Sequence, residues 1–240
     1  MTSASIVGGE LYRDRVLRDG AVGYWRLGEA VGSGTVADGS SNGYTGTVVA
    51  GVTLGQTGAI SDGDTAALFN GSTGEIDLPS IAAPAAVTIE AWAKRGAISS
   101  RQFMIHLFSG LDLEFDATNH LTLNVTGQGA ICVATSTVTD AAFHHLVATY
   151  NGAIAHLYTD NVDVSGTTTV RTYTTGQGWI GCRNNLTSFF SGVLDELAVY
   201  PSVFSVQQVE EHYTLRLSLN TEVWRTPNHL MFLFQPWKYS

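Results

Sequence analysis

The sequence is poor in cysteine and in basic residues, and each shortage excludes a class of protein. Its two cysteines, Cys132 and Cys182, are too few for a disulfide framework in 240 residues. Both lie in apolar, strand-like segments, so we expect two buried thiols, although a bridge between them stays open. Twelve Lys and Arg against 21 Asp and Glu give a formal charge of −9. This acidity argues against a nucleic-acid partner, because few basic groups are there to displace counterions from a phosphate backbone.

Long apolar runs are also missing. No run reaches the roughly 18 residues that a membrane helix requires, so we expect no membrane partner. The segment Met1–Glu10 has neither a basic start nor an apolar stretch, and therefore predicts no signal peptide. With 44% hydrophobic and 14% charged residues, the chain is too apolar to be disordered.

Short apolar segments separated by Gly, Asn, Asp or Ser dominate what is present. Their regular spacing predicts an all-β sandwich of antiparallel sheets. The pairs Asn151-Gly152 and Asp160-Asn161 flank one segment and favour tight turns, which predicts a three-stranded meander there. We expect strands at Tyr24–Leu27, Ala67–Phe69, Glu75–Leu78, Val87–Lys94, Phe103–Phe108, Leu111–Phe115, Leu121–Val125, Ile131–Thr135, His145–Tyr150, Ile154–Thr159, Trp179–Gly181 and Val193–Tyr200.

Helical patterns occur at two places only. Residues 11–18 predict a short helix, and Ser205 with Gln208 three positions later forms a capping-box pattern for a second. Within 87–94, alternation places Thr88, Glu90, Trp92 and Lys94 on the face opposite Val87, Ile89, Ala91 and Ala93. We expect Trp92 and Trp25 to serve the core rather than a ligand.

A series of motifs resembles the laminin-G-like branch of the concanavalin A-like jelly rolls. The resemblance covers roughly residues 10–217, in family order. It rests on Tyr24-Trp25-Arg26-Leu27-Gly28-Glu29, Asp38-Gly39-Ser40-Ser41-Asn42-Gly43, Ala67-Leu68-Phe69-Asn70-Gly71, Thr88-Ile89-Glu90-Ala91-Trp92, His145-Leu146-Val147-Ala148-Thr149-Tyr150 and Gly192-Val193-Leu194-Asp195-Glu196-Leu197.

This resemblance implies a two-sheet antiparallel jelly-roll sandwich with short peripheral helices, which often recognises glycans or proteins and often carries structural calcium. The short helix that runs into a Tyr-Trp-Arg-Leu strand is similar to the start of tailed-phage structural proteins. We therefore expect an N-terminal arm at 1–9, a jelly-roll domain at 10–217 and a docking tail at 218–240. A virion protein leaves the cell by lysis, so a virion-surface or extracellular location needs no signal peptide.

Asp38, Ser40 and Asn42 place oxygens at alternate positions of a Gly-rich loop, a pattern that suits a hard cation. The family arrangement implies that this loop meets Asp195 on the last strand around a calcium ion. The alternative is a hydrogen-bonded turn, with Asp195 accepting backbone N–H groups.

Asp112, Glu114 and Asp116 share one strand face, as do the three carboxylates of glycanases with this fold. Two of the three are Asp where those enzymes carry Glu, and we expect merely the solvated side of a sheet. His144 and His145 are adjacent on a strand and face opposite ways, so they cannot chelate one ion together. We therefore expect no catalytic residue and no enzymatic activity.

For ligand recognition, Arg183, Asn184 and Asn185 offer hydrogen bonds to sugar hydroxyls, and Trp179 offers a ring for stacking. The tail is too apolar to be free in solution and too short to fold alone. Its aromatic residues predict an interface with other virion proteins or with copies of itself: Trp224, Phe232, Phe234, Trp237 and Tyr239.

Together these features predict a non-enzymatic structural or adhesion module of a phage-type virion, as a capsid decoration or minor tail protein that also binds glycans. The alternatives are a stand-alone carbohydrate-binding lectin module and a glycoside hydrolase.

Overall fold

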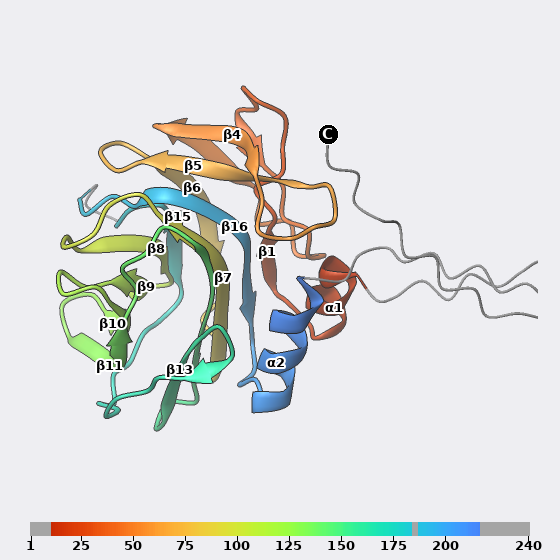
Figure 1. Ribbon diagram of the computed structural model, residues 1–240. Helices are drawn as coiled ribbons and strands as arrows, with labels where there is room; N and C mark the ends of the chain where they lie inside the picture. The colour runs from red at the N-terminus through yellow and green to blue at the C-terminus, as the bar shows by residue number, and fades with distance from the viewer. Residues whose placement is uncertain (1–10, 184–186, 217–240) are drawn as a thin grey trace, which may run out of the picture.

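The chain folds into two antiparallel β-sheets packed face to face, with two short helices on one side, as the computed structural model shows (Figure 1). The structure describes residues 11–183 and 187–216. The predicted arm 1–9, the tail 218–240, and Asn184 and Asn185 lie outside these residues. The prediction of an all-β, two-sheet jelly-roll sandwich is confirmed.

Sheet A is built around the long strand β7. Its strands run, in spatial order, β14 (Val162–Asp163), β13 (Ala155–Thr159), β12 (Phe143–Tyr150), β7 (Val87–Arg95), β16 (Ser191–Tyr200), β5 (Thr65–Asn70) and β4 (Val52–Thr57), and β1 (Gly23–Trp25) also pairs with β16.

Sheet B lies opposite. Its order is β11 (Gly129–Thr137), β10 (His120–Val125), β9 (Leu111–Phe115), β8 (Gln102–Leu107), β15 (Gly176–Ile180), β6 (Glu75–Ile81), β3 (Gly46–Ala50) and β2 (Thr35–Val36). The sequence did not predict β2, β3 and β4. These strands are short or largely exposed, so they lack a clear apolar alternation.

The main core fills the space between the sheets. Val87, Ile89 and Ala91 of β7 point into it, as their alternation predicted. Trp25 also belongs to this core and has no exposed surface, which confirms its structural role.

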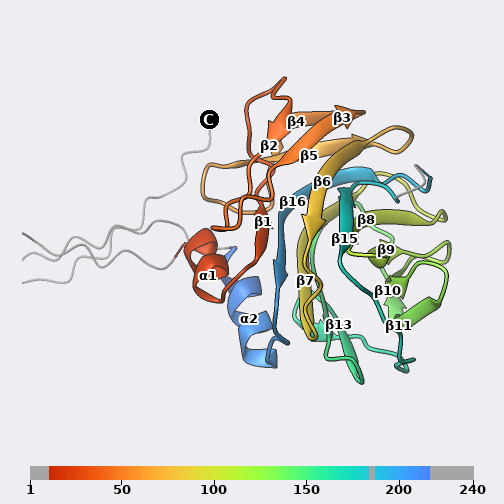
Figure 2. The same cartoon turned by 180° about the vertical axis from the view of Figure 1, so that it is seen from behind.

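Two helices, α1 (Tyr12–Arg18) and α2 (Val206–Leu215), lie against the outer face of sheet A (Figure 2). The capping box is present: Ser205 Oγ accepts from the Gln208 backbone N–H at 3.2 Å, and Gln208 Oε1 accepts from the Ser205 N–H at 3.1 Å. Trp92 is fully buried in a second apolar cluster beneath the helices. The outward polar face of β7 is therefore covered, and Trp92 is core as predicted.

The predicted meander is confirmed in β12, β13 and β14. Asp160 and Asn161, with φ of 50° and 65°, form the two-residue turn between β13 and β14. Cys132 and Cys182 are buried free thiols, so the bridge left open by the sequence is not formed.

Candidate functional site

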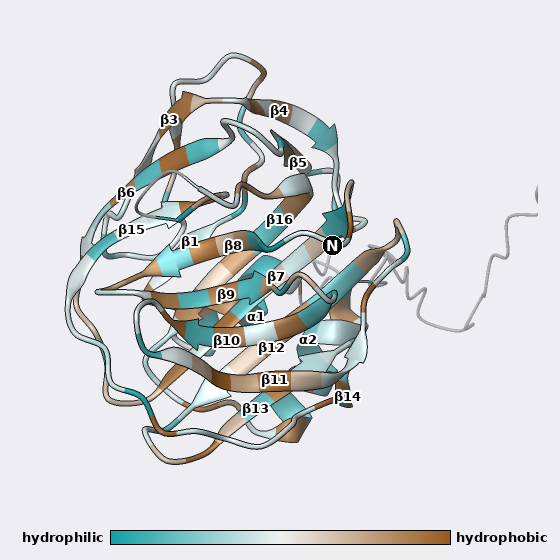
Figure 3. Ribbon diagram, turned by 90° about the vertical axis from the view of Figure 1, so that its left-hand side faces the viewer, coloured by the Kyte–Doolittle hydropathy of each residue, from teal (hydrophilic) through white to brown (hydrophobic). Residues whose placement is uncertain are grey.

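The outer face of sheet B carries no helix in the described ranges, and hydrophilic residues, coloured teal, alternate with hydrophobic ones along its strands (Figure 3). Backbone pairing sets His106 of β8 between Trp179 of β15 and Asp112 of β9. Asn124 of β10 continues this row beyond Asp112. Because Ile105 points into the core, its neighbour His106 and the row paired with it project outward.

Asp112 is the centre of a hydrogen-bonded network on this face. Its Oδ1 lies 2.5 Å from His106 Nδ1, while its Oδ2 accepts from Asn124 Nδ2 at 3.0 Å and from Thr126 Oγ1 at 2.8 Å. Both oxygens are thus engaged, and the carboxylate holds the proton of His106 on Nδ1. The His106 ring in turn lies 5.4 Å from the half-buried ring of Trp179, measured between centroids.

Glu114 forms a bidentate ion pair with Arg101. Arg101 donates from Nε and Nη2 to the two carboxylate oxygens at 2.8 and 2.7 Å. The Glu114 side chain is only 2% exposed, whereas that of Arg101 is 42% exposed. Burial raises the pKa of Glu114 to about 7, and the hydrogen bonds from Arg101 offset this only in part because water screens the guanidinium.

A groove of about 480 Å³ crosses this face. It lies over β9, β10 and β11 and is rimmed by both charged and small side chains. Its lining is Arg101, Glu114, Asp116, Ala117, Thr118, Thr122, Asn124, Gly129, Ala130 and Val133. A concave surface with a few fixed polar groups is typical of a small-molecule or oligosaccharide site.

The three carboxylates that the sequence singled out do not share one environment. Asp112 and Glu114 are buried, so the prediction that they lie on a solvated strand face is wrong. The polar neighbours that cover them come from other strands. Asp116 lies past the end of β9, where it accepts backbone N–H groups of Thr118 and His120 at 2.8 and 2.9 Å. Asp112 and Asp116 therefore have structural partners, and neither is poised as a nucleophile.

Two of the predicted ligand residues, Trp179 and Arg183, lie at the same sheet as Glu114. Trp179 is in the row described above, and Arg183 has its guanidinium 5.9 Å from the Phe103 ring centroid. Arg101 contacts the same ring at 5.0 Å, and Phe103 pairs with Glu114 across β8 and β9. The structure thus joins residues that the sequence analysis treated as separate sites. Strand alternation in β10 was the signal that could have added Thr122 and Asn124.

The predicted cation loop forms a hydrogen-bonded turn. The Asp38 carboxylate accepts backbone N–H groups of Tyr24, Ser40 and Tyr44 at 2.8 to 3.0 Å, and Asn42 donates to a backbone carbonyl. Tyr24 pairs with Ala198, which is three residues along β16 from Asp195. At about 3.3 Å per residue this separates the loop from Asp195 by roughly 10 Å. The four predicted ligands are therefore not brought together.

Asp195 itself has the environment of a carboxylate that lacks a counter-charge. It is 2% exposed; its Oδ2 accepts from the Ala59 N–H at 2.7 Å, and its Oδ1 has no hydrogen-bond partner. Burial and the neighbouring Glu196 raise its pKa well above the usual value. An oxygen donor of this kind fits a hard cation. However, the described residues contain no group of three His, Cys, Asp or Glu side chains that could hold a metal ion.

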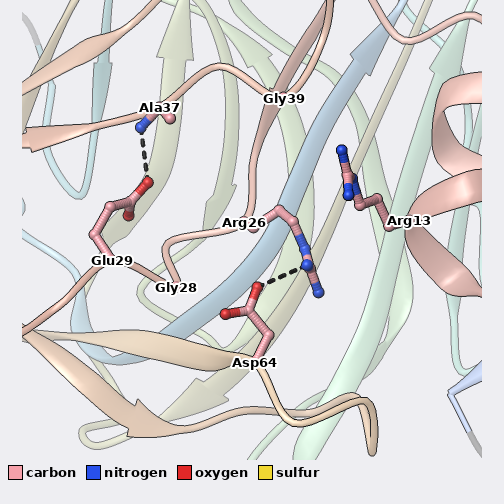
Figure 4. Close-up of a pocket in the computed structure, with 7 residues that line it drawn as sticks. All are labelled: Arg13, Arg26, Gly28, Glu29, Ala37, Gly39 and Asp64. Carbon is pink, nitrogen blue, oxygen red and sulfur yellow. Dashed lines mark hydrogen bonds and ion pairs between the residues drawn. The ribbon is translucent and has the colours of Figure 1, made fainter.

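A smaller cavity of about 230 Å³ lies near β1 (Figure 4). Arg26 dominates it, pairing with Asp64 at 3.0 Å, Asp62 at 2.5 Å and Glu196 at 2.8 Å. Glu29 accepts from the Ala37 N–H at 2.7 Å, and its other oxygen has no partner. The sequence analysis assigned no role to Arg26, because its partners are 36 to 170 residues away.

Comparison with known proteins identifies the fold of this scaffold. In the described ranges no helix is long and apolar enough to cross a membrane. Residues 70–210 match the Laminin_G_3 family model, the concanavalin A-like lectin/glucanases superfamily. No match was found among curated proteins.

Solved structures at low identity share the architecture. A Trypanosoma rangeli sialidase in complex with difluorosialic acid aligns with a TM-score of 0.62 and 17% identity, over 84% of this chain and 34% of that one. Domain 4 of AbnA, a GH43 arabinanase from Geobacillus stearothermophilus in complex with arabinotriose, aligns with a TM-score of 0.55 and 18% identity. The alignment covers 80% of this chain and 98% of that one.

The binding domain of Paraclostridial Mosquitocidal Protein 1 aligns with a TM-score of 0.58 and 16% identity, over 82% of this chain and 52% of that one. The chain thus spans about a third of the sialidase, and identities this low establish the fold alone. The family match covers more than half of the chain, and the chain belongs to the concanavalin A-like lectin/glucanase superfamily.

Proposed function

We propose that this protein is a carbohydrate-binding module that takes an oligosaccharide on the outer face of sheet B. The observation that carries the proposal is the groove over β9, β10 and β11, with its fixed polar groups and with Trp179 in the adjoining row. The solved relatives support it, since their structures include an arabinanase domain with arabinotriose and a sialidase with sialic acid.

The outer face of sheet B supplies two complementary contacts for a sugar, Arg101 in the groove and Trp179 in the row beside it. The Arg101 guanidinium, although paired with Glu114, is 42% exposed and retains N–H groups for a hydroxyl or ring oxygen. Trp179 presents a half-buried ring whose face suits the apolar side of a pyranose or furanose. We further propose that binding occurs without hydrolysis, because both Asp112 oxygens already accept hydrogen bonds.

The test is binding of the full chain to an oligosaccharide panel, followed by titration of each hit. Trp179→Ala and Arg101→Gln should each weaken binding at least tenfold, about 1.4 kcal/mol, and Trp179→Phe should restore part of it. Arg13→Gln on α1 is the matched control and should bind as the wild type does. Equal affinity of all four variants would reject this face, and sugar release lost in Glu114→Gln would favour a hydrolase.

We also propose that the protein is displayed on the surface of a phage-type virion. The support for this proposal is the resemblance of the segment from Leu11 to Glu29 to tailed-phage structural proteins, and the aromatic composition of residues 218–240. The partner residues predicted there, Trp224, Phe232, Phe234, Trp237 and Tyr239, lie outside the described residues. Deleting residues 218–240 should abolish incorporation into particles while the sandwich still folds; unchanged incorporation would refute the docking role.

Calcium is proposed as a structural ion at Asp195 rather than at the Asp38 loop. The support is the partnerless Oδ1 and the proximity of Asp64: its backbone oxygen and Asp195 Oδ2 lie 3.4 and 2.8 Å from the position that a Cβ on Gly58 would occupy. Excess chelator should lower the melting temperature, and Asp195→Asn should remove that response. The Asp38→Asn variant should keep it. An identical melting temperature with and without chelator would refute a structural calcium ion.

A further inference from the structure

The outer face of sheet A holds a second polar cluster, on the opposite side of the sandwich from the groove. Its centre is Glu90 of β7, which has no exposed surface. Glu90 accepts from the Tyr12 hydroxyl at 2.5 Å and from the Tyr200 hydroxyl at 2.7 Å. His145 Nε2 lies at 2.6 Å, and His212 Nδ1 at 3.0 Å from both carboxylate oxygens. These partners come from α1, β16, β12 and α2, so one carboxylate ties both helices to the sheet.

His212 is bounded by carboxylates on both sides. Its Nδ1 faces Glu90, and its Nε2 lies 3.0 Å from Asp19 Oδ2, just after α1. Because each ring nitrogen has an acceptor-only oxygen as its partner, this geometry favours the doubly protonated, charged imidazolium. Arg15 adds to the same chain of contacts through Asp19 at 2.8 Å and through an ion pair with Glu211 of α2.

The remaining charged and titratable groups around the cluster do not change the preference of His212 for its charged form. Tyr24 of β1 donates to Glu196 of β16, and Glu196 is itself paired with Arg26. Arg216, which follows α2, lies over the Trp92 ring, which stacks on His145. Among the described residues, His212 therefore has two carboxylates as hydrogen-bond partners, Glu90 and Asp19.

We propose that Glu90 and His212 form a pH-dependent clamp on α1 and α2, tightest in mildly acidic solution and looser as the pH rises. The device is separate from the proposed sugar site. The clamp therefore controls how firmly α1 and α2 are held on sheet A.

The direction of the pH dependence follows from the linkage between protonation and folding. Burial lowers the pKa of His212, but Glu90 and Asp19 outweigh it, so the pKa in the folded protein is above the usual 6.5. Burial raises the pKa of Glu90, but His212 and His145 hold it well below 4.5. The Glu90 contribution is present above pH 4.5 and lost in stronger acid. The His212 contribution is complete below pH 6.5 and is lost as the pH rises through its folded pKa.

The helices α1 and α2 can detach from sheet A without unfolding of the whole sandwich. The helices pack on their own cluster, which includes Tyr12, Trp92 and Val209, while the core between the sheets is a distinct cluster. Elements with few core contacts open at lower free energy than central strands do. Loss of charge on His212 is therefore expected to loosen α1 and α2 before β9 and β10.

Amide hydrogen exchange of the full wild-type chain tests this without any variant. After correction for intrinsic exchange, protection in 12–18 and 206–215 should fall as the pH rises above about 6.5, and by more than protection in 111–125. A uniform change over all segments, or none in the helices, would overturn the proposal.

Variants test the role that the proposal assigns to His212. The wild-type melting temperature should fall over the same pH range, by about 3–5 °C for each unit by which folding raises the pKa of His212. His212→Gln should lose the part of this slope that His212 contributes and keep the parts that come from Glu114 and His144, whose pKa values are raised to about 7 and about 9. His156→Gln, at an exposed His–Asp pair, is the matched control and should retain the whole slope. A wild-type slope in His212→Gln would contradict the clamp, and if that variant fails to fold, the exchange profile decides.

Discussion

At the scale of single residues, buried carboxylates organise both outer faces of the sandwich. Asp112 and Glu90 are each fully buried on a central strand. An isolated charge there would be costly, so each is surrounded by donors that compensate it. Asp112 fixes the orientation of His106 beneath the proposed sugar site, whereas Glu90 joins two helices to sheet A.

Replacing Glu90 by Gln should destabilise the protein strongly. The substitution removes the charge that compensates His212 and leaves His145, Tyr12 and Tyr200 with a poorer acceptor. Breaking a buried ion pair on one side costs about 3–5 kcal/mol. Urea unfolding at pH 6 measures this, with Glu210→Gln on the exposed side of α2 as the control. A loss similar to the control's would contradict the central role of Glu90.

Glu114 should respond to pH in the opposite sense to Glu90. Because its folded pKa is raised to about 7, ionisation opposes folding as the pH rises from 4.5 through 7. Glu114→Gln should therefore gain stability relative to the wild type between pH 4 and pH 8, by up to about 3 kcal/mol. Denaturant unfolding at both pH values checks this; a constant difference would show that Arg101 compensates the charge fully.

Residue roles were predictable from the sequence only where local pattern decides them. Alternation correctly placed Glu90 and Trp92 on the outward face of β7. The partners of Glu90 lie 55 to 122 residues away, so no local pattern could show that this face is covered. The Asp38 loop was assigned to a cation from oxygen spacing alone, yet its own backbone N–H groups satisfy that carboxylate.

At the scale of elements, α2 illustrates how a local signal fixes a boundary. The capping box satisfies N–H groups that the first helical turn leaves unpaired. The strands with a clear apolar alternation were also predictable, as was the hairpin of β13 and β14, whereas β2, of two residues, exists through pairing with β3. Pairing between strands distant in sequence is not encoded in any local pattern.

Ser205→Ala should shorten or loosen α2. The substitution removes the acceptor of the Gln208 N–H, and loss of such a cap costs about 1 kcal/mol. Chemical denaturation measures the loss, and Ser202→Ala, at an exposed position before the helix, is the control. An unchanged midpoint would mean that contacts with sheet A alone determine where α2 begins.

At the scale of the whole molecule, the two faces of the sandwich have different tasks. The outer face of sheet A is covered by α1 and α2, which hold both outer limits of the described chain (Figure 1). The outer face of sheet B lies on the other side and bears the groove.

The fold class and most strands followed from the sequence, but the groove did not. It depends on Arg101 and on the register that sets β9 beside β10 and β8. The structure places Trp179 and Arg183 at sheet B, and their role in ligand binding stays a prediction, as does that of Asn184 and Asn185, which lie outside the described residues.

The central claim, that sugar is bound on the outer face of sheet B, is tested most directly by mapping amide chemical shifts of the full chain during titration with a bound oligosaccharide. The proposed site predicts saturable shifts in residues 101–107, 111–133 and 176–180. Shifts confined to α1, α2 and the strands β4 and β5 of sheet A would contradict it.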